Sequence, residues 1–145
     1  MASRRKGRIL AFQALYFWES SSNNGERVPL EDLVGFAWLG NEKLEKLDEE
    51  MAVFSRTLIA GTLENINDID KMIIDHLQNW DITRLNRVDL AILRISAYTL
   101  MFQNDISPSI VIDEAIGISM EYGTDDSFKF INGVLDSIRK AAVKT

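Results

Sequence analysis

The 145-residue sequence contains no cysteine, only two prolines and a single histidine. The lack of cysteine excludes disulfides, thiolate metal sites and cysteine nucleophiles, and it fits a reducing compartment. His76, the single histidine, lies in a helical pattern and makes a poor metal site without a second ligand, so we expect a partly exposed helix residue. No apolar run approaches the roughly 18 residues that span a bilayer, and no secretory signal is evident. We therefore expect a cytoplasmic protein without a membrane partner, metal or cofactor.

Recognisable catalytic motifs are also missing. The chain has no Gly-rich phosphate loop, and no serine has an evident activating base. Neighbouring carboxylates such as Asp113 and Glu114 point about 100° apart on a helix, so they do not form a dyad by adjacency. The turn at residues 123–127 precedes a helix and can present amides to a phosphate, but its two aspartates oppose an anion. We predict that the protein is not an enzyme.

Apolar spacing is helical almost throughout, and no stretch alternates with period two for long enough to be a strand. The longest pattern places Leu85, Val88, Ile92, Ile95 and Thr99 inward, and Phe102 extends that face. The segment at residues 41–50 is polar and reads as a connector or a poorly buried helix start. We predict one all-α domain, residues 1–145, with about seven helices. Their expected starts are Ser3, Pro29, Met51, Asn67 or Asp68, Thr83, Ser107 or Pro108, and Thr124 or Asp125.

Positive charge is concentrated at the start of the chain. Arg4, Arg5, Lys6 and Arg8 give +4, whereas the whole chain carries −6, so the remaining residues carry −10. An acidic body repels phosphates, so any contact with nucleic acid must be local and helped by shape, stacking or a partner. The cations run directly into aromatic residues, which can stack on unpaired bases.

Two interpretations of this first helix stay open. In one, Arg5, Phe12 and Tyr16 share an angular sector and present a cationic surface with exposed rings next to Gln13. In the other, Phe12, Leu15 and Tyr16 are core residues and the cations only solvate a frayed terminus, because amphipathic helices usually bury their aromatics.

Three separated stretches together resemble the NusB family of bacterial transcription antitermination factors. They cover nearly the whole chain in the family's order, and any one alone would be weak. The first is Arg4-Arg-Lys-Gly-Arg-Ile-Leu-Ala-Phe-Gln-Ala-Leu-Tyr16. The second is Trp80-Asp-Ile-Thr-Arg-Leu-Asn-Arg-Val-Asp-Leu-Ala-Ile-Leu-Arg-Ile-Ser-Ala-Tyr98. The third is Pro108-Ser-Ile-Val-Ile-Asp-Glu-Ala115, followed by Phe130-Ile-Asn-Gly-Val-Leu-Asp136.

The resemblance implies two packed helical bundles and an RNA-binding function. In this family, boxA-type single-stranded RNA from ribosomal RNA leader transcripts is bound together with ribosomal protein NusE. The pair then joins RNA polymerase antitermination complexes that read through terminators. A partner that supplies cations would explain how an acidic body holds RNA.

The resemblance also implies roles for particular residues. An acidic residue near the junction of RNA and partner corresponds to Asp89. Arg94 and Tyr98 match family positions but are explained equally well by packing, and Asn132 and Gly133 suggest a capping contact and a close helix approach. The implied RNA-binding residues are Arg4, Arg5, Lys6, Arg8, Gln13, Tyr16, Asp126, Lys129 and Phe130.

The chain departs from the family pattern at three positions of one helix. Asp113 stands where the family commonly has Asn and cannot donate from its side chain. Gly117 and Met120 replace a frequent acidic residue and a lysine, and Gly117 should weaken its helix by roughly 1 kcal/mol relative to alanine. We expect these changes to lower RNA affinity.

Two other functions remain open from the sequence. One is a helical protein–protein interaction module, or a homodimer, without specific RNA binding. The other is the detached RNA-recognition half of a ribosomal RNA cytosine methyltransferase, although 145 residues hold no cofactor-binding domain. For the RNA-binding function, four neutralised phosphates predict a slope of about −3 for log affinity against log salt.

Overall fold

The computed structural model describes residues 3–22, 26–77 and 81–143, so Trp80 of the second motif lies outside the described residues. Within these ranges the chain forms eight α-helices and two 3₁₀ helices, with no β-strand. In chain order they are α1 Ser3–Ser20, α2 Leu30–Val34, η1 Ala37–Leu39, α3 Asn41–Glu45, α4 Glu49–Glu64, α5 Ile66–Asp75, η2 Ile82–Arg84, α6 Arg87–Phe102, α7 Pro108–Tyr122 and α8 Ser127–Val143. None of these described helices is long and apolar enough to cross a membrane.

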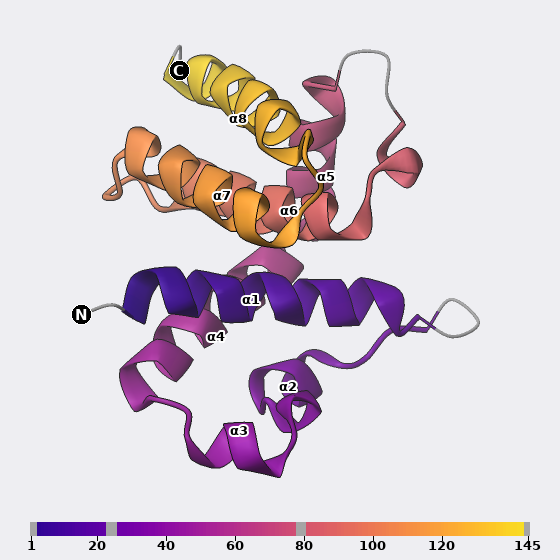
Figure 1. Cartoon of the computed structure of the whole chain (residues 1–145). Coiled ribbons are helices and arrows are strands. Elements are labelled where there is room, and N and C mark those ends of the chain that lie inside the picture. Colours follow the sequence, from indigo (N-terminus) through magenta and orange to yellow (C-terminus); the bar gives the residue numbers. More distant parts are fainter. Residues whose placement is uncertain (1–2, 23–25, 78–80, 144–145) are drawn as a thin grey trace.

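The helices form two packed groups with α1 between them. Figure 1 shows α2, α3 and α4 on one side of α1, and α6, α7 and α8 on the other. The all-α prediction and the two bundles are confirmed. One more helix than expected is present because the polar segment at residues 41–50 contains α3, a helix of five residues without a fully buried side chain.

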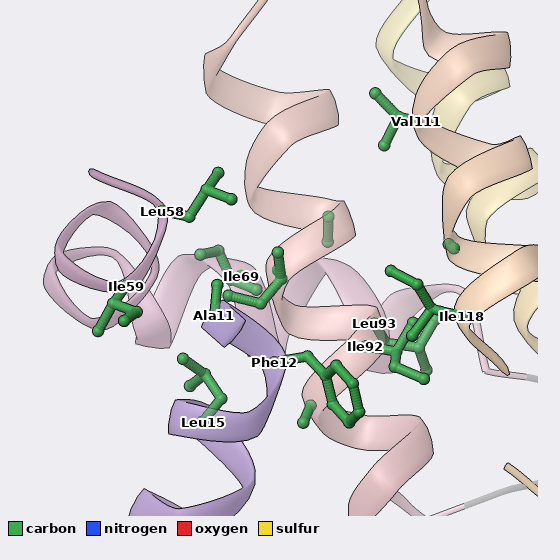
Figure 2. Close-up of a cluster of buried hydrophobic side chains, with 14 of the residues drawn as sticks. Ala11, Phe12, Leu15, Leu58, Ile59, Ile69, Ile92, Leu93, Val111 and Ile118 are labelled. Carbon is green, nitrogen blue, oxygen red and sulfur yellow. The ribbon is translucent and has the colours of Figure 1, made fainter. Parts of the chain in front are cut away.

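The first helix is central to the core because it buries residues on two of its sides. Ala11 and Leu15 are completely buried, and Phe12 is 4% exposed. Figure 2 shows Phe12 directed toward Ile92 and Ile118, whereas Ala11 and Leu15 lie on the side of α4. Because α1 packs against both bundles, these contacts determine which of its side chains are buried. Its other side chains lie at the surface, where the two bundles meet.

Local capping explains where α6 begins. The pattern predicted a helix from Thr83, but residues 82–84 form η2, and Leu85 is extended with ψ of 142°. The Asn86 side chain then accepts hydrogen bonds from the backbone N–H groups of Val88 (2.7 Å) and Asp89 (3.4 Å), so α6 starts at residue 87. Helix α5 begins at residue 66, before the expected caps at residues 67 and 68, and no side chain caps its first turn.

One face of α6 is less buried than the pattern predicted. Phe102 is 45% exposed, so it does not extend the inward face, and its ring instead stacks on Tyr98 with centroids 5.4 Å apart. A methyl group at Gly61 of α4 would overlap the Tyr98 ring. Tyr98 therefore fills the space between α4 and α6, as a packing role predicts.

A buried arginine joins three helices. Arg94 of α6 is 5% exposed and donates two hydrogen bonds of 2.9 Å to the carboxylate of Asp70 on α5. It also donates to Glu19 of α1 at 3.3 Å, and its guanidinium lies 5.6 Å from the ring centroid of Trp18. These contacts assign Arg94 to the packing of the two bundles.

Candidate nucleic-acid interface

The cations at the start of α1 point in different directions. Arg4, Arg5 and Lys6 are exposed, whereas Arg8 is only 4% exposed. The Arg4 guanidinium lies 5.7 Å from the ring centroid of Phe54 on α4. Arg5 instead reaches α7. Three of the four predicted cations therefore lie at the surface.

The structure corrects the prediction for Arg8. This side chain forms an ion pair with Glu114 of α7 in the interior. Burial, and secondarily the charge of Arg4, lowers the pKa of Arg8. Four-residue spacing places Arg8 on the same buried side of α1 as Phe12. Arg8 is therefore a structural cation, and we remove it from the set expected to meet phosphate.

Arg5 is held at the surface of α7. Its Nη2 atom donates to Oε2 of Glu121 at 3.1 Å, and the two side chains are 47% and 53% exposed. A methyl group at Gly117 would lie 2.8 Å from Nη1 of Arg5 and 3.4 Å from its Cζ. The absent side chain at Gly117 thus lets the guanidinium lie close to the helix.

The aromatic residues of α1 divide between the core and the surface. Phe12 is buried, but Tyr16, one turn later, is 41% exposed, and Gln13 is half-buried. Tyr122 of α7 is 39% exposed, and its ring contacts Phe12 edge to face at 5.2 Å. The interpretation of a buried aromatic residue is therefore correct for Phe12, and the interpretation of an exposed ring is correct for Tyr16. Sequence reasoning missed Tyr122, whose place beside α1 depends on a contact distant in the chain.

The start of α8 borders a pocket of about 340 Å³. Asp126 and Lys129 are exposed, and the Lys129 ammonium lies 5.8 Å from the ring centroid of Phe128. The turn before α8 is fixed by the Ser127 hydroxyl, which accepts from the backbone N–H of Thr124 at 2.9 Å. The residues that line the pocket are Arg84, Leu85, Asn86, Asp89, Thr124, Asp126, Ser127 and Phe130.

Asp89 lies in the wall of this pocket and is only 7% exposed. Burial raises the pKa of its carboxyl group, and a hydrogen bond with Ser127 opposes that rise. Its Oδ1 atom is buried and has no hydrogen-bond partner within the described chain. The predicted interface residue is therefore a recessed carboxylate rather than a group on an open surface.

The surface connects the two ends of the candidate site. Tyr122, next to α1, is followed four residues later by Asp126, which lines the pocket. The predicted set thus lies on two segments, the exposed residues of α1 and the start of α8, and Tyr122 is the residue of α7 that contacts α1 closest in sequence to the second. The expected close approach at Gly133 is wrong: this residue and Asn132 are exposed, and a methyl group at Gly133 would have no neighbour within 4 Å.

The single histidine has a local partner. Nδ1 of His76 lies 2.7 Å from the hydroxyl oxygen of Ser137, and the residue is partly exposed, as the pattern predicted. In the part of the chain that the structure describes, no group of three or more acidic or histidine side chains is placed to hold a metal ion.

Comparison with known proteins gives one consistent result. The model of the NusB family matches residues 5–140. The transcription antitermination protein NusB of Treponema denticola is 49% identical over 136 residues, covering 94% of this chain and 95% of its own. NusB of T. maritima has a structure with a TM-score of 0.77 and 33% identity, covering 98% of this chain and 97% of its own. A solved complex of antitermination factors NusB and NusE with double-stranded RNA gives a TM-score of 0.81 at 28% identity, with 97% and 98% covered. The chain belongs to the NusB family.

Proposed function

We propose that this protein binds boxA-type single-stranded RNA of ribosomal RNA leader transcripts together with ribosomal protein NusE. The pair acts within an RNA polymerase antitermination complex in the cytoplasm, and the protein catalyses no reaction itself. The observation that carries this proposal is the exposed ring of Tyr16 on the same helix as the exposed cations Arg4, Arg5 and Lys6. The solved NusB–NusE complex with RNA, which shares this fold, supports it.

We infer two kinds of contact with RNA, one to phosphates and one to bases. Arg4, Arg5 and Lys6 neutralise phosphates, which gives affinity without sequence preference. Tyr16 and Tyr122 offer ring surfaces on which unpaired bases can stack.

The pocket at the other end of the surface suits a base edge. Phe130 provides an apolar wall, and the carboxylates of Asp89 and Asp126 accept hydrogen bonds from base amino groups. These same carboxylates repel phosphates. The protein therefore needs NusE to bring further positive charge to the RNA.

Salt titration tests the phosphate contacts. With three cations in place of four, log affinity for a boxA-like RNA should fall against log salt with a slope of about −2. Replacing Arg4, Arg5 and Lys6 by Ala should remove most of this slope for every RNA, whereas Lys43→Ala, an exposed cation on α3, should leave it unchanged. Tyr16→Ala should instead change the preference among RNA sequences.

A second titration tests the partner. NusE added at saturation should tighten RNA binding, and RNA should tighten NusE binding by the same factor. A flat salt response together with independent binding of RNA and NusE contradicts the proposed function. Light scattering on the same samples detects a homodimer that hides the α1 surface.

A further inference from the structure

The ion pair between Arg5 and Glu121 joins α1 to α7 at the edge of the candidate RNA surface. Both side chains are about half exposed, and Nη2 of Arg5 lies 3.1 Å from Oε2 of Glu121. Exposed pairs of this kind add little to folding stability, because water screens the attraction and two long side chains lose freedom. The pair is therefore easily exchanged for another anion.

We propose that the Glu121 carboxylate occupies the place on Arg5 that an RNA phosphate takes in the complex, so that Glu121 limits the affinity for RNA. This inference rests on the proposed function. A guanidinium group presents its N–H donors in a planar fork that fits a carboxylate or a phosphate equally well. The edge of Arg5 that holds Glu121 cannot serve both anions at once, and the displaced carboxylate stays close enough to repel the phosphate.

Gly117 makes this arrangement possible. Since a methyl group there would approach Nη1 of Arg5 to 2.8 Å, any larger residue would move the guanidinium away from α7. Glycine thus keeps Arg5 against the helix and within reach of Glu121, one turn later. Tyr122 follows Glu121 directly, so the exchange takes place beside an exposed ring that can stack on a base.

The test is a double-mutant cycle on RNA affinity, at a salt concentration where every variant binds measurably. Glu121→Gln should bind a boxA-like RNA about threefold more tightly than the unaltered protein. Glu45→Gln makes the same chemical change at an exposed position of α3 and should alter affinity much less. In the Arg5→Ala background, Glu121→Gln should lose most of its effect, because no guanidinium is left to release. Far-UV circular dichroism checks that each variant is folded.

Four results would overturn the inference. Weaker binding by Glu121→Gln would mean that Glu121 orients Arg5 for RNA instead of competing with it. An equal gain in the presence and absence of Arg5 would show a general charge effect. An unaltered protein that binds RNA with the expected salt slope, but responds equally to Glu121→Gln and Glu45→Gln, would overturn this inference alone. Absence of salt-dependent RNA binding would overturn the proposed function and this inference with it.

Discussion

The buried pair of Arg8 and Glu114 allows the sharpest test of the structure. The Arg8 side chain is 5% exposed and that of Glu114 is 22% exposed. Glu114→Ala leaves a buried guanidinium without a compensating charge, which should cost about 3–5 kcal/mol of the free energy of unfolding. Because a domain of this size is stable by only about 5–15 kcal/mol, the loss should be large in a urea titration followed by circular dichroism.

Two further variants separate pairing from packing. Arg8→Met leaves Glu114 partly open to water, so it should cost less than Glu114→Ala, roughly 1–3 kcal/mol. Replacing both residues by Met removes both buried charges and keeps apolar volume, so this double variant should be within about 1 kcal/mol of the unaltered protein.

RNA binding by the double Met variant then tests the assignment of Arg8. If Arg8 is structural, this variant keeps the salt slope of about −2. A slope weaker by about 0.7 would mean that Arg8 reaches a phosphate in the complex, and a cost below about 1 kcal/mol for Glu114→Ala would mean that the pair is not buried in solution. Either result would refute the reasoning.

Five other substitutions, at four positions, test packing and burial, each by urea denaturation. Gly133→Ala should stabilise α8 by about 1 kcal/mol because its surroundings are open, whereas Gly61→Ala should destabilise the fold by overlap with Tyr98. Phe36→Ala should cost about 3–5 kcal/mol because the ring is fully buried, and Phe36→Gly should recover part of that loss because φ is 60°. Asp89→Asn should be more stable than the unaltered protein at neutral pH, where burial penalises the ionised carboxylate. That advantage should shrink as the pH falls through the raised pKa and vanish below the ordinary value of 3.8, where both states are protonated.

The fold was largely predictable because helical periodicity is local. Ile92 and Ile95 recur at the spacing that one buried face requires, and both are buried. The start of α6 was misplaced because Leu85 fits the same spacing, while the Asn86 side chain that caps the helix overrides it. Phe102 fits the spacing too, but it lies at the helix end, where no partner covers it fully.

Residues of the candidate site were predictable only where their exposure depends on spacing within one helix. The pattern of α1 predicted that Arg4, Arg5 and Lys6 reach solvent, but it left Tyr16 open between the core and the surface. Arg8 fits the cationic pattern and the buried spacing equally well, and only Glu114, far along the chain, decides between them. Nothing in the sequence marks Tyr122 or Glu121 as a residue of the site, because only tertiary packing brings α7 next to α1.

Two glutamate carboxylates reduce the positive charge that the start of α1 offers to RNA. Of the four cations at the start of α1, Glu114 neutralises Arg8 inside the fold and Glu121 pairs with Arg5 at the surface. Electrostatic attraction to phosphate is therefore weaker than the basic sequence suggests, and it leaves a larger share of binding to stacking and base contacts. Stacking tolerates salt, so the proposed RNA complex should lose affinity less steeply with salt than a fully exposed basic arm would. It should also depend more strongly on the charge that NusE contributes.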